Sequence, residues 1–242
     1  SPKKLLFLDN SEFGLYKINN KIHNLILEKK VETELFPILG SVQDEKFIEA
    51  LFKRFKIETI YHAAAYKHVP LVEKNIIEGI KNNIFGTFIL SEVAVKNNVE
   101  SFILISSDKA VRPTNLMGAS KRISELVVQA SQNNDIKENL DFKSRTIFLM
   151  VRFGNVINSS GSVIPLFQKQ IKEGGPITLT HEKINRYFMT INEACQLVIH
   201  SSSLAKGGDL FLLDMGNPVE IKKIAEQMIS LSGLTLKNSA NP

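Results

Sequence analysis

The stretch FILISSDKAVRPTNLMGASK, residues 102–121, contains the features that decide the fold. It begins with a short apolar run, which predicts a buried strand. A polar segment follows at once, and the last residues have the spacing of one face of a helix. A buried strand that leads through a polar segment into a helix is typical of α/β proteins, which place reactive groups at the ends of their strands.

The rest of the chain repeats this alternation of apolar runs and amphipathic segments. Strands are expected at residues 5–8, 59–62, 102–105, 147–151 and 210–213, and helices at 116–131 and 191–204 among others. Strands that alternate with helices need crossover connections, so they predict a parallel sheet. After about residue 156 the loops lengthen, which favours a smaller part added to that sheet.

Composition narrows the class of protein. The 242 residues, 43% of them hydrophobic, are enough for one large or two small domains with a sizeable core. The net charge of +5 is spread along the chain, which weakly favours an anionic small molecule and disfavours nucleic acid as a ligand. No apolar stretch reaches the roughly 20 residues that span a bilayer, so we expect no membrane contact and a soluble, cytoplasmic chain. The single cysteine, Cys195, fits a reducing compartment and is expected to be buried.

Asp9 ends the first predicted strand, in the sequence D-N-S. In a dinucleotide-binding unit, a carboxylate at the end of the second strand binds the adenosine ribose and selects NAD over NADP. An ordinary turn aspartate is the alternative. The strand and Gly-rich turn that should precede it do not occur in the sequence. We therefore expect a piece of a longer protein, a gap in its sheet, and weak NAD binding by this piece alone.

Small and polar side chains mark further candidates. Three alanines, Ala63 to Ala65, follow the strand at 59–62, where small side chains let a flat cofactor approach the backbone or let helices pack tightly. Asn83 lies in a helix-like segment, where a buried amide is unfavourable unless it forms hydrogen bonds. The histidines are scattered among unrelated segments, so we expect no metal site.

Three segments taken together resemble a known family: HAAAYKHVP (62–70), the stretch 106–121 and RFGNV (152–156). They are similar to the extended short-chain dehydrogenase/reductase superfamily, and within it to the UDP-N-acetylglucosamine 4,6-dehydratases of bacterial polysaccharide and glycan biosynthesis. The likeness covers practically the whole chain. It is strongest to the long, membrane-anchored form in which methionine replaces the catalytic tyrosine.

The resemblance implies both a fold and an activity. The fold would be a doubly wound parallel (Rossmann) sheet that lacks its first strand here, with an NAD-binding domain over 1–155 and a UDP-sugar-binding part over 156–242. The activity would be removal of water from UDP-N-acetylglucosamine with an internally recycled NAD. The full-length protein would act at the cytoplasmic side of the inner membrane, as a homo-oligomer.

The resemblance also assigns catalytic roles. Asp108 is the acid for the departing C6 hydroxyl and Lys109 the base for the C5 proton, roles that need burial to stabilise the neutral form of each. Lys121 follows Met117 by one helical turn and would bind the nicotinamide ribose. A thioether has no proton to exchange, so Met117 cannot accept the C4 hydroxyl proton. Ser107 is hypothesised to relay that proton to Lys121, to Lys109 or to water.

Binding residues follow from the same resemblance. Those implied for NAD are Asp9, Asn10, Ser11, Ser41, Val42, Ala63, Ala64, Ala65, Lys67, Asn83, Ile105, Ser106, Lys121 and Val156. Those implied for UDP-N-acetylglucosamine are Lys67, His68, Val69, Asn155, Ser162, Val163, Pro165 and Arg186. The turn at 160–165 would offer backbone N–H groups, and Arg186 would bind the diphosphate or pair with a surface carboxylate. Ser41 stands where relatives usually have an aspartate, which shortens or removes one contact with adenine.

Two alternatives stay open. One is a UDP-sugar C4 epimerase of the same superfamily, against which Asp108 and Lys109 argue, because epimerisation needs neither a C5 base nor a C6 acid. The other is an inactive protein that binds a nucleotide sugar or NAD. Met117 and the missing Gly-rich turn would suit this second alternative.

Overall fold

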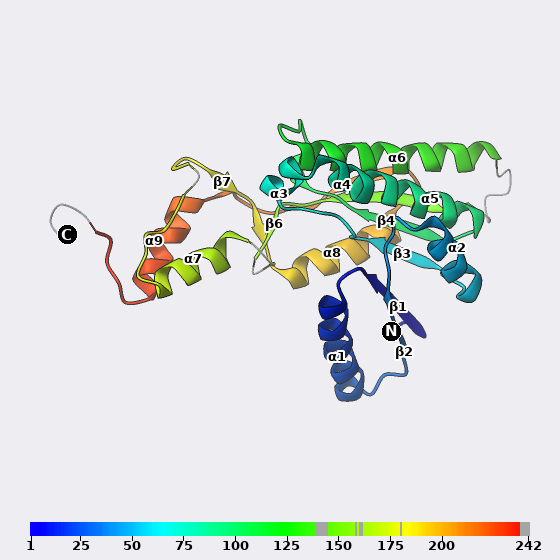
Figure 1. The fold of residues 1–242 in the computed structure, drawn as a ribbon, viewed down its shortest axis with the longest axis horizontal. Helices are drawn as coiled ribbons and strands as arrows, with labels where there is room; N and C mark the ends of the chain where they lie inside the picture. The colour runs from blue at the N-terminus through cyan, green and yellow to red at the C-terminus, as the bar shows by residue number, and fades with distance from the viewer. Residues whose placement is uncertain (139–144, 158, 160–161, 180, 238–242) are drawn as a thin grey trace.

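The computed structural model describes residues 1–138, 145–157, 159, 162–179 and 181–237 (Figure 1). Four of the described strands form a parallel sheet in the order β3-β4-β5-β9. Their bounds are β3 (Thr59–His62), β4 (Ser101–Ile105), β5 (Ile147–Arg152) and β9 (Asp209–Leu212). Each overlaps an apolar run in the sequence, so the predicted α/β fold with a parallel sheet is confirmed.

A further parallel pair of strands lies apart from this sheet. Strand β1 (Lys4–Asp9) pairs with β2 (Glu34–Leu39), and neither forms a ladder with the described strands of the larger sheet. The sequence did not predict β2, because Pro37 interrupts its apolar run. Proline is tolerated in an edge strand, since it removes a donor that the sheet does not need there. The strands are thus divided where a gap was expected, beside the strand that ends at Asp9.

Helices cover both faces of the larger sheet (Figure 1). On one face lie α2 (Glu45–Arg54), α5 (Gly86–Lys96) and α6 (Leu116–Glu138), and on the other lies α8 (Ile191–Leu204). Helix α1 (Glu12–Lys29) packs against β1 and β2 instead. The predicted helices at 116–131 and 191–204 are both present. None of the helices in the described ranges is long and apolar enough to cross a membrane.

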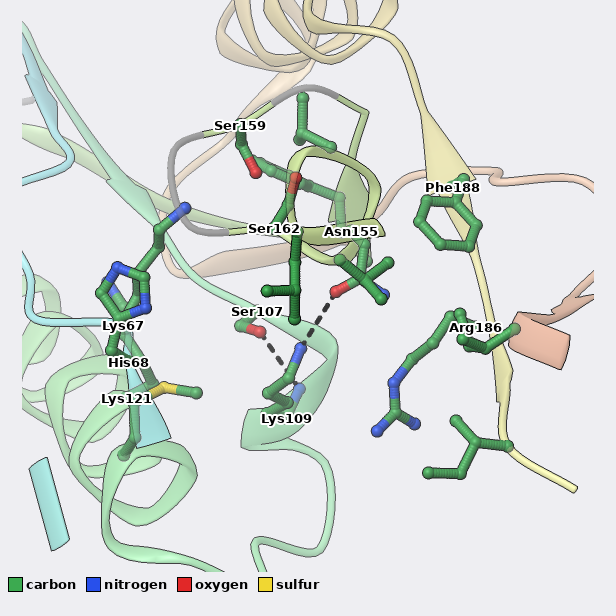
Figure 2. A pocket seen from close by; sticks show the side chains of 18 of the residues that line it. Lys67, His68, Ser107, Lys109, Lys121, Asn155, Ser159, Ser162, Arg186 and Phe188 are labelled. Carbon is green, nitrogen blue, oxygen red and sulfur yellow. Dashed lines mark hydrogen bonds between the residues drawn. The ribbon is translucent and has the colours of Figure 1, made fainter. Parts of the chain in front are cut away.

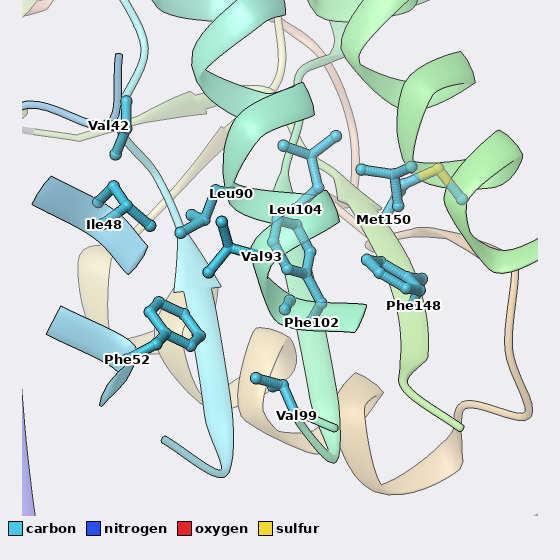
Figure 3. Packing of buried hydrophobic residues seen from close by; sticks show 12 residues of the cluster. Val42, Ile48, Phe52, Leu90, Val93, Val99, Phe102, Leu104, Phe148 and Met150 are labelled. Carbon is cyan, nitrogen blue, oxygen red and sulfur yellow. The ribbon is translucent and has the colours of Figure 1, made fainter. Parts of the chain in front are cut away.

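The two faces of the sheet form separate cores. Phe102 and Phe148, whose ring centroids lie 5.1 Å apart, point toward α2, α5 and α6 (Figure 3). Their chain neighbours Ile103 and Leu149 point to the opposite face and pack with residues of α8. Successive side chains of a strand alternate between faces, so a strand buried on both sides reads as a continuous apolar run.

Helix α8 corrects one expectation. Its buried face is formed by Ala194, Val198 and Ser201, which recur at helical spacing. Cys195 lies beside this face and is exposed, not buried as the sequence suggested. An apolar helix segment of mixed periodicity did not reveal which side faces the sheet.

The C-terminal elements lie beside the carboxyl ends of the larger sheet (Figure 1). They are β6 (Asn155–Val156), α7 (Val163–Lys172), β7 (Asn185–Arg186), β8 (Phe188–Met189), β10 (Val219–Glu220) and α9 (Ile221–Leu231). Strand β6 pairs with β8, and β7 with β10. Between β8 and β10 the chain returns to the larger sheet as α8 and β9, so the segment after residue 156 contributes to both parts.

Candidate active site

A cavity of about 660 Å³ lies at the carboxyl ends of β3, β4 and β5, against the C-terminal elements (Figure 2). Its volume falls in the range of roughly 300–1,000 Å³ that ligand sites occupy. Ligands of open parallel sheets bind at this edge. Many of the candidate residues predicted from the sequence directly follow these strands.

Most of the predicted residues line this cavity. From the cofactor set these are Ala63, Ala65, Lys67, Ile105, Ser106, Lys121 and Val156, from the substrate set Lys67, His68, Asn155, Ser162, Val163 and Arg186, and from the catalytic set Ser107, Lys109, Met117 and Lys121. The remainder, which do not line it, are Asp9, Asn10, Ser11, Ser41, Val42, Ala64, Val69, Asn83, Asp108 and Pro165. Residues 160 and 161 of the predicted turn lie outside the described residues.

The predicted adenosine contacts belong to a different part of the fold. Asp9 accepts a hydrogen bond from Ser11 N at 2.8 Å, and the Ser11 hydroxyl accepts one from Gly14 N at 3.1 Å, which caps α1. These are the bonds of an ordinary turn and cap, the alternative considered for Asp9. Val42 is buried in the core. Binding of a cofactor by these residues stays a prediction.

Asn83 holds two walls of the cavity together from behind. It lies in a π-helical segment, η1 (Lys81–Phe85), and is buried. Its Oδ1 accepts from Tyr66 N at 2.8 Å, while its Nδ2 donates to Tyr66 O at 3.1 Å and to Ser120 Oγ at 2.9 Å. The expectation that this buried amide forms hydrogen bonds is confirmed. The bonds connect the loop after β3 to helix α6.

Ser107, Asp108 and Lys109 form a hydrogen-bonded cluster after β4. The Ser107 hydroxyl donates to Asp108 Oδ1 at 2.9 Å, and Lys109 Nζ donates to the same oxygen at 3.2 Å. Lys109 Nζ also donates to Asn155 Oδ1 at 3.4 Å (Figure 2). Lys109 therefore faces the cavity with Asp108 directly behind it. The side chains of Lys109 and Asp108 are 30% and 27% exposed, so the enclosed apolar surrounding expected for this pair is not observed.

Met117 and Lys121 both reach the cavity from α6, as their spacing predicted. Both are buried, and Lys121 Nζ donates a hydrogen bond to Ile105 O at 2.7 Å. Burial lowers the pKa of Lys121 to about 8, although the carboxylate of Glu125 acts in the opposite direction. Lys121 is thus a cation held at the end of β4, close to its titration range at neutral pH.

Gly118 brings the cluster after β4 close to α6. A Cβ added at this glycine would collide with the carbonyl oxygen of Lys109. The hydrogen bond from Gly118 N to Asn115 Oδ1, at 2.8 Å, caps the start of the helix at the same point. The distance between Lys109 and the face of α6 that carries Met117 and Lys121 therefore depends on the absence of a side chain here.

The cavity is strongly cationic. Lys67, Lys109, Lys121 and Arg186 line it, and among the described residues that line it there is no aspartate or glutamate. Desolvation first, and then the ammonium of Lys109, lower the pKa of Lys67. Lys67 and Lys121 lie at one end and Arg186 at the other, with Lys109 between them (Figure 2). No carboxylate in the described part of the chain forms an ion pair with Arg186, so an anionic ligand is the partner that this cavity fits.

Sequence reasoning missed several residues of the C-terminal wall. They are Phe153, Gly154, Ser159, Leu166, Phe167, Thr178, Leu179, His181, Ile184, Phe188 and Ile221. Phe188 follows Arg186 at strand spacing, and this alternation was the one usable signal. The segment 173–184 has no periodicity, so nothing in the sequence indicated that it reaches the cavity. Within the described residues no cluster of three or more His, Cys, Asp or Glu could hold a metal ion.

His62 lies behind the cavity at the end of β3 and is buried. Its Nε2 is 2.9 Å from Thr87 Oγ1, which donates its own proton to Asn83 O at 2.7 Å. Nε2 therefore carries the proton and donates to the threonine. Burial, with a smaller effect of the Lys121 ammonium, lowers the pKa of His62 to about 3. The ring is neutral in the folded protein over the physiological range.

Because the pKa of His62 is lowered in the folded protein, we expect the protein to lose stability in mild acid. Between pH 6.5 and 3 the unfolded state binds a proton at His62 and the folded state does not, so the free energy of unfolding falls as the pH falls. From pH 7 to about pH 5 the expected loss is about 2 kcal/mol. His62→Gln keeps a donor for Thr87 but cannot titrate, so it should lose less over this interval. Urea unfolding of both proteins at the two pH values measures the difference, and an equal loss in both would contradict the assignment.

The fold and the cavity define an α/β protein with a cationic cavity at the carboxyl ends of its parallel strands, where ligands of such sheets bind. The family described as "Polysaccharide biosynthesis protein" matches residues 1–242, and the chain belongs to that family. The capsular polysaccharide biosynthesis protein CapD of Staphylococcus aureus is 47% identical over 232 residues, which cover 96% of this chain and 37% of CapD. The chain thus spans little more than a third of the length of this relative.

Other comparisons agree with this family. A UDP-glucose 4-epimerase of Rickettsia canadensis is 34% identical over 174 residues, or 72% of this chain and 49% of the epimerase. The solved structure of Pen from Bacillus thuringiensis has a TM-score of 0.84 and 31% identity, and covers 98% of this chain and 69% of Pen. The fold is shared with the dTDP-glucose 4,6-dehydratase DesIV from Streptomyces venezuelae, at a TM-score of 0.77, 16% identity and coverage of 98% and 83%. The chain is thus a member of the polysaccharide biosynthesis protein family and is similar in sequence to a UDP-glucose 4-epimerase.

Proposed function

We propose that this chain is the catalytic part of an NAD-dependent dehydratase that converts UDP-N-acetylglucosamine to the UDP-4-keto-6-deoxy sugar for bacterial glycan synthesis. The observation that carries the proposal is the pair Asp108 and Lys109, joined at 3.2 Å, with the lysine in a cationic cavity at the strand ends. An acid and a base side by side are what removal of water from C5 and C6 requires. Neither is needed for epimerisation at C4.

The proposal also covers the roles of the two parts of the chain and the setting of the full-length protein. Residues 1–155 are proposed to bind NAD and residues 156–242 to bind the UDP-sugar, with the cavity between them. The full-length protein is proposed to act at the cytoplasmic side of the inner membrane, as a homo-oligomer. Membership of the polysaccharide biosynthesis family supports the role in glycan synthesis.

The end of the cavity beside Lys121 fits NAD. Ala63 and Ala65 leave the wall after β3 without large side chains, so a flat ring can lie against it. Lys121 is held by Ile105 O with its ammonium at this end, where it can donate to a ribose hydroxyl. Bound NAD would supply the acceptor and later the donor of one hydride. The residues at 9–11 and 41–42 would have to bind its adenosine away from the cavity described here.

The opposite end fits a nucleoside diphosphate. Arg186 offers a planar guanidinium with no carboxylate partner among the described residues, which suits two phosphate oxygens. Ser162 Oγ is buried and has no hydrogen-bond partner in the part of the chain that the structure describes. A buried hydroxyl without a partner is costly, and a ligand at this end would satisfy it. The sugar then lies between the two ends, at Lys109 and Asn155.

The hydrogen bond between Lys109 and Asp108 offers a route to the neutral states that their proposed roles require. Transfer of one proton from Lys109 Nζ to Asp108 Oδ1 along their hydrogen bond yields a free amine and a carboxylic acid at once. A sugar that excludes water favours this transfer, because a low dielectric disfavours the charged pair. Lys109 then takes the C5 proton of the 4-keto sugar, and Asp108 protonates the C6 hydroxyl as it leaves. Lys109 finally returns a proton to C5 of the resulting C5=C6 double bond, while C6 would receive the hydride that bound NAD took from C4.

Mass spectrometry separates the three candidate functions. The full-length protein is incubated with UDP-N-acetylglucosamine and NAD, and the nucleotide sugar is analysed. The proposal expects a product lighter by one water. A product of unchanged mass with an altered sugar would show an epimerase, the activity that the name of the Rickettsia relative gives. An unchanged substrate would show a protein that binds without catalysis.

Because Met117 cannot accept the C4 hydroxyl proton, hydride transfer from C4 needs another proton acceptor, and Ser107 is the proposed relay. The Ser107 hydroxyl donates to Asp108 Oδ1, which also accepts from Lys109 Nζ, so a relay from Ser107 to Lys109 would pass through Asp108. We expect Ser107→Ala to slow hydride transfer from C4 by about 100-fold, in the range for loss of an acid or base. Stopped-flow absorbance of NADH measures this step. If Met117→Tyr raised the rate greatly while Ser107→Ala left it unchanged, the relay through Ser107 would be wrong.

A further inference from the structure

Glu125 is a fully buried carboxylate that no catalytic role uses. It lies on α6, one turn after Lys121, and accepts four hydrogen bonds. Ser106 Oγ and Arg152 Nε donate to its Oε1 at 2.6 and 2.7 Å. An Arg152 amino group and an Arg122 amino group donate to its Oε2 at 2.5 and 2.9 Å. Both oxygens are therefore fully engaged.

These bonds join the elements that carry the proposed active site. Ser106 directly follows β4 and precedes the cluster of Ser107, Asp108 and Lys109. Arg152 is the last residue of β5 and precedes the turn to Asn155. Glu125 itself belongs to the helix that carries Met117 and Lys121. One carboxylate thus ties two strand ends to the helix, at the level where all three meet the cavity.

We infer that Glu125 is a positioning residue, which sets the place of the Ser107–Lys109 cluster against α6 and supplies the negative charge that keeps Lys121 a cation. This inference rests on the proposed function for its effect on turnover. The effect of Glu125 on the charge of Lys121 does not depend on the proposed function, because the ionisation of Lys121 can be measured without any substrate.

The surroundings of Lys121 explain why Glu125 keeps its amine charged. Charged or titratable groups around Lys121 come from β3 with His62, from the loop after β3 with Lys67 (Figure 2), from the turn after β4 with Lys109, from β5 with Arg152, and from α6 with Glu125. His62 is neutral, and the other neighbours are basic side chains, so the carboxylate of Glu125 alone of these groups favours the charged amine. Without its charge, burial lowers the pKa of Lys121 below its value of about 8. The amine would then lose its proton at a lower pH.

A buried ion pair that only stabilises the fold is the competing explanation. Removal of one member of a buried pair destabilises a protein whatever its function. The test therefore needs measurements that a purely structural role would not change. Two are suitable: the pH at which Lys121 becomes reactive, and the separate changes in kcat and KM.

The experiment compares Glu125→Gln, Glu125→Asp and the control Arg122→Gln in the full-length protein. Arg122 is partly exposed and donates one bond to Glu125, so its variant perturbs the network without removing the charge. Lys121 is acylated with acetic anhydride across a pH series without ligand, and its modification is followed by peptide mass spectrometry. We expect the midpoint to move to lower pH in Glu125→Gln and to stay at the wild-type value in Glu125→Asp and Arg122→Gln.

The kinetic measurement tests position. In Glu125→Asp the carboxylate is one methylene shorter, so it cannot reach both strand ends, and kcat is expected to fall by about 100-fold with KM nearly unchanged. Should Glu125→Gln fail to fold, shown by circular dichroism, the kcat of Glu125→Asp still decides the positioning role. A wild-type kcat in Glu125→Asp would overturn the positioning role. An unshifted midpoint in folded Glu125→Gln would overturn the electrostatic role. If wild type releases no water at all, the proposed function fails while the acylation result still stands.

Discussion

Lys109→Met should reduce the rate of water loss from UDP-N-acetylglucosamine by about 10³-fold, within the range for loss of a general base. Methionine keeps the length of the side chain but has no amine, so it can take no proton from C5. The fold should be retained, because the lysine is partly exposed and its amine bonds, among the described residues, only Asp108 and Asn155. Product formation followed by mass spectrometry gives the rate. Lys53→Met, at an exposed lysine of α2, is the matched control.

A substitution of Asp108, the hydrogen-bond partner of Lys109, gives a second test of the pair. Asp108→Asn keeps an oxygen that can accept from Lys109 and Ser107 but cannot deliver a proton to the C6 hydroxyl. We expect a loss similar to that of Lys109→Met. Because the two residues act as one unit, the double variant should be little worse than either single variant. Rates within tenfold of wild type in both single variants would contradict the assignment of acid and base.

Gly118→Ala should lower kcat by about 100-fold, the cost expected when a catalytic group is displaced by about 1 Å. The added methyl group would collide with the carbonyl oxygen of Lys109, so the turn that holds Asp108 and Lys109 must move away from α6. Alanine is the better helix former by about 1 kcal/mol. The helix itself is therefore not weakened, and the effect comes from displacement.

A neighbouring substitution controls for the helix. Ala119→Gly removes a methyl group from the next residue of α6 and weakens the helix without pushing on Lys109. It should lose stability and keep most of its activity, the reverse of Gly118→Ala. Thermal unfolding and kcat of both variants measure the two effects. Near-normal turnover in Gly118→Ala would show that the spacing between the turn and α6 is unimportant.

Much of the fold could be predicted because the larger sheet is covered on both faces. Strands such as β4 and β5 are buried on both sides, so they stand out as apolar runs between polar segments. Helix α6 was equally clear from its spacing. Strand β2 was missed because Pro37 breaks its run, and the exposure of Cys195 was missed because the orientation of α8 depends on packing.

The site could be predicted in part for a geometric reason. The carboxyl ends of parallel strands meet at one edge, so Ala63, Lys109 and Asn155 come together although they are far apart in the chain. Asp9 and Ser41 do not reach this cavity, because they follow β1 and β2, which pair apart from the larger sheet. The bonds of Glu125 depend on three elements at once, and no local pattern indicates such a meeting.

The central claim is that Lys109 and Asp108 exchange protons with C5 and C6 of a nucleotide-bound hexose. The most direct measurement is the mass of the product when the full-length protein acts on UDP-N-acetylglucosamine in deuterium oxide with NAD. Lys109 takes its exchangeable protons from the solvent, so the account predicts a product that has lost one water and gained one deuterium at C5. A sugar nucleotide of unchanged mass without carbon-bound deuterium would contradict it.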